Sequence, residues 1–181
     1  MARGSVTRKA LAQSIKKLMR STPYEKISVE MITDGCSLNR KSFYYHFQNK
    51  DELVNWILDN EFREYLESTP EEEQGWDVVA MLCKYLYSER DLYRAILTSS
   101  STSHVKDHFR LVMEPVLMKY LRDIFNVERS KTDFLVFASD TFLAAIERWL
   151  ASEEMQNPSD FLFAFRSRLI MLSERSLLNF R

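Results

Sequence analysis

Three cationic side chains lie at the starts of two neighbouring predicted helices near the amino end of the chain. Arg40 and Lys41 follow Asn39, whose side chain can cap the first of these helices. Lys50 follows Asn49, which can cap the second. Cations at a helix N-terminus are disfavoured by the helix dipole by roughly 0.3–1 kcal/mol each. An external anion reverses this preference, because helix N-termini bind phosphate well. The pattern therefore predicts a surface that faces phosphate, with DNA as the natural partner.

The same charges also fit a surface hairpin whose lysines and arginines only keep the protein soluble. Neighbouring aromatic residues favour the DNA interpretation. Phe43 and Phe47 are four residues apart and can both face a core, whereas Tyr44 and Tyr45 point elsewhere. A phenolic hydroxyl on a helix surface can donate to phosphates or base edges, and His46 can do the same.

Two helices joined by a tight turn position these side chains. The first has Ser28 as its N-cap and an apolar side that includes Val29 and Ile32. Residues 36–38 form the turn, and the second helix runs from about 40 to 46. Two short helices meeting in this way, with the second entering the major groove, are typical of a helix-turn-helix.

The stretch FYYHFQNKDEL at 43–53 resembles the signature of the TetR family of bacterial transcription regulators. Upstream, YEKISV at 24–29, followed by Ile32, resembles the family's entry into its second helix. The resemblance covers roughly residues 7–66, and the chain is similar to the Firmicute-type branch that includes regulators of dihydroxyacetone kinase operons. One departure is Ser37 at the turn, where the family usually has Gly. A positive φ at this serine carries a conformational cost that Gly avoids.

The resemblance implies an all-α protein that binds double-stranded operator DNA. Residues 5–66 are the expected helix-turn-helix DNA-binding domain, and 67–181 the expected helical domain for dimerisation and ligand binding. We expect the first turn of the second helix to approach bases, and several hydroxyl and cationic groups to hold phosphates. The predicted DNA-binding residues are Thr7, Ser28, Asn39, Arg40, Lys41, Ser42, Tyr44, Tyr45, His46 and Lys50.

Composition agrees with a helical regulator. The 181 residues suit a small DNA-binding domain and a larger bundle, and 3 Gly and 4 Pro with 45% hydrophobic residues favour a helical globular protein. No apolar run of about 18 residues indicates a membrane span, and no leader segment is recognised, so we expect a cytoplasmic protein. Cys36 and Cys83 are too few for a disulfide framework or a thiolate zinc site.

Charge is distributed unevenly along the chain. Residues 1–50 hold 10 Lys or Arg and 3 Asp or Glu, whereas 51–181 hold 15 and 23. The formal net charge of −1 thus combines +7 with −8. A basic end on an acidic body fits a protein that presents one end to nucleic acid.

Helical spacing and breaks predict the remaining elements. We expect an irregular arm before Thr7, which then caps the first helix. The segment STPEEEQ at 68–74 is the clearest break, and the serine-rich stretch 98–103 is expected to be a flexible loop. The other predicted helices are 7–19, 49 to about 66, 76–87, 91–97, 104–125 with a possible kink at Pro115, 132–151, and a last helix opened by Asn157-Pro158.

The last two predicted helices favour a homodimer. Residues 132–151 carry apolar side chains around nearly the whole helix circumference, and the helix after Pro158 has the same character. A helix that is apolar all round must be buried on every side. A twofold interface with the same pair of helices from a second subunit is the economical solution, and it predicts a pseudo-palindromic operator.

An effector site is expected from the family. Large apolar side chains between the predicted helices 76–87, 104–125 and 132–151 serve as core or as the lining of a pocket for an unknown small-molecule effector. The candidates are Tyr85, Tyr93, Phe109, Met113, Phe137 and Trp149.

The sequence shows little sign of metal binding or catalysis. His104 and His108 share one helix face, but no third metal ligand is evident, so we predict no metal site and no cofactor. No nucleophile motif or Glu-x-x-His pattern indicates an enzyme. An adaptor that keeps the helical head but acts only through protein contacts is the remaining alternative to a DNA-binding regulator, which we expect to be a repressor.

Overall fold

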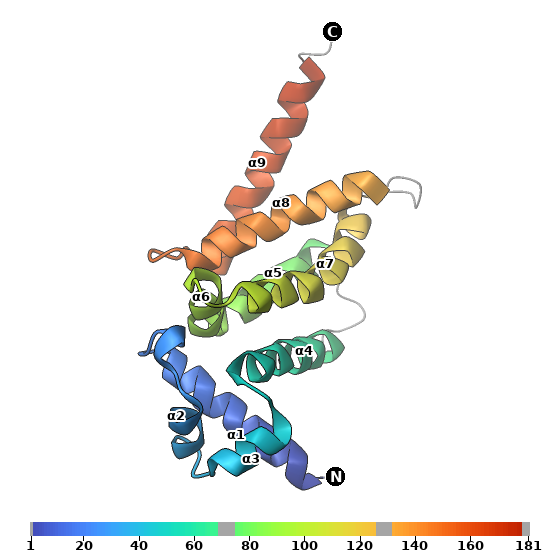
Figure 1. Ribbon diagram of the computed structural model, residues 1–181. Coiled ribbons are helices and arrows are strands. Elements are labelled where there is room, and N and C mark those ends of the chain that lie inside the picture. Colours follow the sequence, from blue (N-terminus) through green and yellow to red (C-terminus); the bar gives the residue numbers. More distant parts are fainter. Residues whose placement is uncertain (1, 69–74, 126–131, 179–181) are drawn as a thin grey trace.

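The computed structural model describes residues 2–68, 75–125 and 132–178, and over these residues the protein is helical with no strand (Figure 1). This confirms the predicted all-α fold class. The elements in order are α1 (Ala2–Met19), the 3-10 turn η1 (Tyr24–Lys26), α2 (Val29–Asp34), α3 (Arg40–His46), α4 (Lys50–Ser68), α5 (Trp76–Ser88), α6 (Arg90–Thr98), α7 (Ser103–Phe125), α8 (Thr132–Ala151) and α9 (Pro158–Leu178).

Helices α1, α2 and α3 gather at one end of the molecule, which we call the head, and α5 to α9 form the body (Figure 1). Helix α4 lies between them and packs on α1 and on α7. Side chains buried inside the head include Leu11, Ile15, Ile32 and Phe43. Apolar residues of all three head helices thus form one core, which fixes the direction of α3.

The caps predicted for α2 and α4 are confirmed. Ser28 Oγ accepts a hydrogen bond from the amide of Met31 at 3.2 Å at the start of α2. Asn49 Oδ1 accepts from the amide of Glu52 at 2.9 Å at the start of α4. The carboxylate of Glu52 in turn accepts from the amide of Gln48 at 2.6 Å, which closes a reciprocal arrangement of the capping-box type.

The first helix is longer than predicted. Residues 2–6 are helical instead of forming an irregular arm, and Thr7 lies within α1 instead of capping it. The side chain of Arg8 donates to the carbonyl of Gly4 at 3.4 Å inside this first part of the helix. Once a helix has formed, each added residue gains a hydrogen bond, so the helix continues until a strong stop signal. Residues 2–6 contain no such stop.

The body is built around aromatic side chains. Tyr93 of α6 and Phe109 of α7 are buried with ring centroids 5.5 Å apart. Phe142 of α8 is fully buried beside α9, and Trp149 stacks on Phe161 of α9 at 4.4 Å. Helix α7 passes through Pro115 without ending. The predicted break at 68–74 falls almost wholly outside the described residues, and Ser68 still belongs to α4.

The serine-rich stretch between α6 and α7 is a non-helical turn, as predicted, and two of its side chains are packed against other parts of the chain. Ser99 and Thr102 are buried. Thr102 Oγ1 donates to the carbonyls of Ile96 and Ser99 at 2.5 and 3.0 Å, and Lys106 Nζ donates to the Ser99 carbonyl at 2.9 Å. Ser99 Oγ also donates to the carboxylate of Glu25 in the head. Composition alone could not predict this packing, because several of the hydrogen-bond partners lie outside the serine-rich stretch.

Helices α8 and α9 are only partly covered within one chain. Residues including Leu135, Phe142 and Ile146 of α8 face the interior. Phe134 remains half-exposed on α8, and Phe163 and Met171 are 73% and 61% exposed on α9. One subunit therefore leaves uncovered apolar surface on the two helices for which a dimer interface was predicted. Within the described ranges, no helix combines the length and apolar character needed to cross a bilayer.

Candidate nucleic-acid interface

The α2–α3 unit is held together by local hydrogen bonds. Asn39 Oδ1 accepts from both the amide and the hydroxyl of Ser42, at 2.8 and 3.0 Å, and so caps α3 as predicted. The amide of Leu38 donates to the carbonyl of Thr33 at 2.9 Å across the turn. Ser37 has φ 55°, the left-handed conformation that was in question for this position. Ser37 thus adopts, at this turn, a conformation that glycine takes at lower cost.

Gly35 is needed for close approach to α1. The hydroxyl of Ser14 is buried and donates to the carbonyl of Ile32 at 2.7 Å. A Cβ at position 35 would lie 2.4 Å from Ser14 Oγ. This short distance shows that the C-terminal end of α2 is fitted closely against α1, which sets the position of α3.

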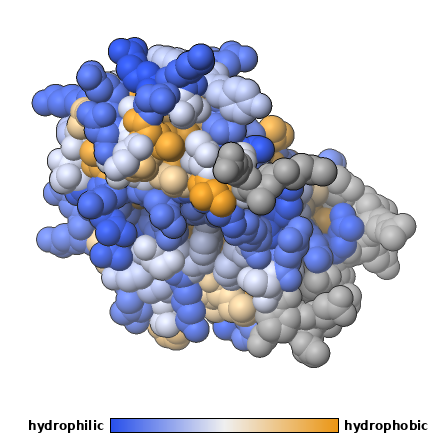
Figure 2. Space-filling view, turned by 90° about the horizontal axis from the view of Figure 1, so that it is seen from below, coloured by the Kyte–Doolittle hydropathy of each residue, from blue (hydrophilic) through white to orange (hydrophobic). Residues whose placement is uncertain are grey.

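Helix α3 separates its aromatic residues as predicted. Phe43 and Phe47 are buried, with ring centroids 5.9 Å apart. Tyr44 and Tyr45 are 51% and 84% exposed. The head end of the molecule presents a largely hydrophilic surface (Figure 2). The helix therefore anchors itself by one side and offers phenolic hydroxyls on another.

Arg40 and Lys41 are exposed at the start of α3. Neither forms an ion pair with a carboxylate in the part of the chain that the structure describes. A hydrogen bond with Tyr44 raises the pKa of the Arg40 guanidinium above its usual value. Both side chains stand at the end of the helix where the dipole favours an anion.

His46 is half-buried at the end of α3. Its ring lies 4.9 Å from that of Tyr45, and a Cβ on Gly4 would lie 3.6 Å from its Cε1. Burial lowers the pKa of His46, and the positive charge of Arg8 lowers it further. The imidazole is therefore mainly neutral at pH 7, so at this pH it offers hydrogen bonds to DNA but no full charge.

Lys50 is placed differently from the predicted phosphate contact. Its ammonium donates to the backbone carbonyls of Tyr24 at 2.6 Å, Ile27 at 3.0 Å and Glu25 at 3.5 Å. It also lies 4.3 Å above the Tyr24 ring, and the Tyr24 hydroxyl donates to Asp51. Burial lowers the pKa of Lys50, which the charges of Asp51 and Glu25 oppose. These contacts join Lys50 at the start of α4 to η1. They also occupy the donors that a phosphate contact would need.

The predicted pocket residues lie in different parts of the described structure. Tyr93, Phe109 and Met113 are buried in the body core. Phe137 is 67% exposed on the outer side of α8, which corrects its placement as a pocket residue. Phe137 and Phe142 lie on different faces of α8, so Phe137 points away from the core in which Phe142 is buried.

Two further pocket candidates lie elsewhere. Trp149 stacks between Tyr87 and Phe161 and donates to the carbonyl of Gln156 at 2.8 Å. Tyr85 stacks on Tyr65 of α4 at 4.6 Å. Tyr85 lines a hollow of about 490 Å³ at the junction of α1, α4 and α5, outside the body core.

The two histidines of α7 do not form a metal site in the described residues. His108 pairs with Asp59 of α4 at 2.9 Å, and His104 is exposed. Among the residues whose positions are given, no group of three potential ligands could hold a metal ion. His108 instead joins the body to α4, a contact that the sequence spacing did not reveal.

Comparison with known protein families identifies the class of protein to which this helical arrangement belongs. Residues 13–57 match the family described as "Bacterial regulatory proteins, tetR family". Residues 76–167 match a second TetR description, "Transcriptional regulator C-terminal region". The chain belongs to the TetR family. It is therefore a DNA-binding transcription regulator and not an enzyme, and the resemblance read from residues 43–53 is confirmed.

Individual relatives agree with this assignment. The chain is 31% identical over 136 residues to the HTH-type dhaKLM operon transcriptional activator DhaS of Lactococcus lactis subsp. lactis (strain IL1403), covering 74% of this chain and 68% of the relative. Among solved structures, a dihydroxyacetone kinase operon activator DhaS has a TM-score of 0.73 at 22% identity, covering 92% of this chain and 96% of that one. NalD, the secondary repressor of the MexAB-OprM multidrug efflux pump in Pseudomonas aeruginosa, has a TM-score of 0.61 at 17% identity, covering 94% and 97%. These two structures share the fold of this TetR-family chain.

Proposed function

We propose that this TetR-family chain binds a pseudo-palindromic operator as a homodimer, with α3 of each subunit in the major groove. The observation that carries the proposal is the pair Arg40 and Lys41, which are exposed at the capped start of α3 without a carboxylate partner in the described residues. A helix start that holds two unpaired cations on an outer surface suits a polyanion.

The positions of the residues around α3 suggest which of them contact bases and which contact phosphates. Arg40, Lys41 and Ser42 occupy the first turn, from which recognition helices read base edges. Ser28 and Tyr44 are exposed and can donate to phosphates. Asn39, Tyr45, His46 and Thr7 complete the proposed DNA-binding set. Lys50 is left out of the direct contacts, because three carbonyls already accept from its ammonium.

The proposed dimer uses α8 and α9. Phe134 of α8 and Phe163 and Met171 of α9 are exposed apolar side chains on these two helices. Burying them against the same surfaces of a second subunit would remove apolar area from water, at roughly 25 cal/mol per Å². A twofold axis through this interface would present two heads to one face of the duplex, as a pseudo-palindromic operator requires.

Control of an operon is proposed from the relatives, and its direction is open to test. The Lactococcus lactis relative is named an activator of the dhaKLM operon, and this similarity supports control of an operon of the same kind. The sequence analysis predicted a repressor. A promoter fused to a reporter gene, with and without the regulator, distinguishes the two by a rise or a fall in expression.

The effector is proposed to be a small molecule or a partner protein. The core around Tyr93, Phe109 and Met113 is fully buried, so a small molecule that binds there has to open it. A partner protein instead needs only exposed surface on the body. Both alternatives act through the body, which holds the head by the contacts described above.

Selection of bound sequences from random double-stranded DNA tests the proposal. We expect enrichment of two inverted half-sites, one for each head, and binding whose log–log salt slope is near −0.9 for each phosphate neutralised. Replacing Arg40 and Lys41 by Ala should abolish the enrichment while the protein stays folded. If the native protein enriches no sequence, the adaptor alternative that works through protein contacts replaces this proposal.

A further inference from the structure

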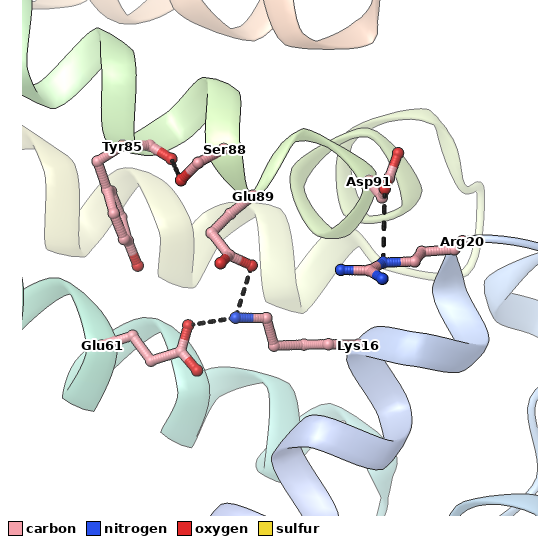
Figure 3. A network of polar contacts seen from close by, with 7 residues as sticks. All are labelled: Lys16, Arg20, Glu61, Tyr85, Ser88, Glu89 and Asp91. Atoms are coloured by element: carbon pink, nitrogen blue, oxygen red, sulfur yellow. Dashed lines mark hydrogen bonds and ion pairs between the residues drawn. The ribbon is translucent and has the colours of Figure 1, made fainter.

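One ammonium group lies where the head, α4 and the body meet. Lys16 of α1 extends between two carboxylates (Figure 3). Its Nζ is 2.8 Å from Glu61 of α4 and 2.5 Å from Glu89, which stands between α5 and α6. The three charges come from three separate parts of the fold, so their contact fixes those parts relative to one another.

The Lys16 site is more enclosed than the other ion pairs nearby. The side chains of Lys16, Glu61 and Glu89 are between 19% and 29% exposed. Arg20 and Asp91, the neighbouring pair across the same junction, are 3.7 Å apart and far more exposed (Figure 3). Ion pairs between exposed side chains contribute little because water and salt screen them, whereas enclosed pairs are screened less. Among these contacts, Lys16 is therefore the one best placed to hold an orientation.

The ammonium also separates two like charges. Burial by itself lowers the pKa of Lys16, but hydrogen bonds and charges from Glu61 and Glu89 outweigh burial and raise the pKa above its usual value. Lys16 is thus charged throughout the neutral range. The two carboxylate oxygens contact the same nitrogen, so they lie within about 5.3 Å of each other. Without the ammonium they would repel, and α4 would be pushed away from the start of α6.

We propose that Lys16 is a positioning residue for operator recognition: by holding Glu61 and Glu89 together, it fixes the head against the body and so sets the spacing of the two recognition helices in the dimer. The inference rests on the proposed dimeric binding of two half-sites. It assigns Lys16 no contact with DNA, since its ammonium points to the junction of α4 and the body and not to the face that carries Arg40 and Lys41.

This role predicts a change in spacing preference and not in the affinity of one head. Inserting one base pair between half-sites moves them apart by about 3.4 Å and rotates one relative to the other. A head held at a fixed angle should bind such an operator about tenfold more weakly, within the 5- to 150-fold range of ordinary coupling between sites. Loss of the Lys16 contacts should reduce this penalty to about twofold.

Three variants of the full chain test the role of Lys16. Lys16→Met removes the ammonium but keeps the aliphatic chain, and Lys17→Met changes the adjacent exposed lysine as a matched control. Glu89→Gln removes the negative charge on the body side of the contact and leaves the head unchanged, so it tests the role even if Lys16→Met is unfolded. Each is measured by fluorescence anisotropy on the selected operator, the same operator with one inserted base pair, and a single half-site, with circular dichroism to verify folding.

The expected result is a reduced spacing penalty for Lys16→Met and Glu89→Gln, an unchanged penalty for Lys17→Met, and half-site affinity within about twofold of the native protein for all three. A native spacing penalty in the folded Lys16→Met or Glu89→Gln variant would overturn the inference. So would an equal reduction in the Lys17→Met control. Failure of the underlying dimer proposal is recognised separately, because the native protein itself would then bind the full operator no better than a half-site.

Discussion

Two lysines that the sequence predicted to contact DNA, Lys41 and Lys50, have different surroundings in the structure. Lys41 is exposed at the start of α3 and forms no ion pair with a carboxylate in the described residues. Lys50 gives its donors to carbonyls of residues 24–27, at distances down to 2.6 Å. Both lysines have the same charge and lie at the start of a helix. Their roles differ because backbone carbonyls lie within reach of Lys50.

Salt dependence of DNA binding distinguishes these two roles. Lys41→Ala should weaken binding and make the log–log salt slope shallower by up to about 0.9, the value for one neutralised phosphate, because a cation that faces the DNA is lost. Lys50→Ala should instead lower the free energy of unfolding by about 1–3 kcal/mol, as expected for lost hydrogen bonds to a charged group, and leave the slope unchanged. Anisotropy titrations at several salt concentrations and urea denaturation measure both. A shallower slope for Lys50→Ala would restore its predicted role as a phosphate contact.

At the scale of elements, the α2–α3 turn combines a close approach with a strained backbone. Gly35 lies where a Cβ would meet the hydroxyl of Ser14, and Ser37 adopts φ 55°. Only the second position is in the left-handed region, so only there does glycine offer a conformational advantage. The departure from the family's usual glycine therefore has an energetic cost that the surrounding hydrogen bonds outweigh.

Replacing Ser37 by Gly should make the protein more stable. The left-handed conformation costs a residue with a Cβ about 1–2 kcal/mol, and the greater freedom of glycine in the unfolded chain offsets part of the gain, so we expect about 0.5–1 kcal/mol. Urea denaturation measures the change, and operator affinity should be retained. Gly35→Ala is the matched control and should destabilise, because Ser14 Oγ would be 2.4 Å from the new Cβ. A less stable Ser37→Gly variant would contradict the strain argument.

At the scale of the whole molecule, the basic head and the helices α8 and α9 lie toward opposite ends (Figure 1). The net charge of the first 50 residues is +7 and that of the remainder is −8. An acidic body discourages binding of DNA by the wrong end. The apolar side chains of α8 and α9, far from the head, remain available to a second subunit.

A charge at the proposed interface should separate the subunits. Phe163 is 73% exposed in one chain, and Phe163→Asp would bury an unpaired carboxylate in the dimer. We expect a monomer in analytical ultracentrifugation, and operator affinity reduced about a hundredfold because the advantage of two linked heads is lost. Leu111→Asp on α7 is the control, since this leucine is 67% exposed but lies outside α8 and α9. A dimeric Phe163→Asp variant with native affinity would place the interface elsewhere.

The sequence alone determined the features that depend on spacing along one segment. The caps at Ser28 and Asn39, the burial of Phe43 and Phe47, and the exposure of Tyr45 all follow from local periodicity and capping chemistry. Such features involve residues three or four apart, whose geometry a helix fixes by itself. The motif at 43–53 was specific enough to predict the family.

Tertiary structure decided every feature whose partner lies far along the chain. Lys50 finds its acceptors 23 to 26 residues away, and Lys16 reaches Glu61 across 45 residues. Ser99 is ordered by Glu25 of the head, and Phe137 lies outside the body core because of how α8 packs on its neighbours. Periodicity gives the direction of a side chain relative to its own helix, but not which other helix lies there. That choice is made when the apolar faces pack together, and with it the partner of each charge.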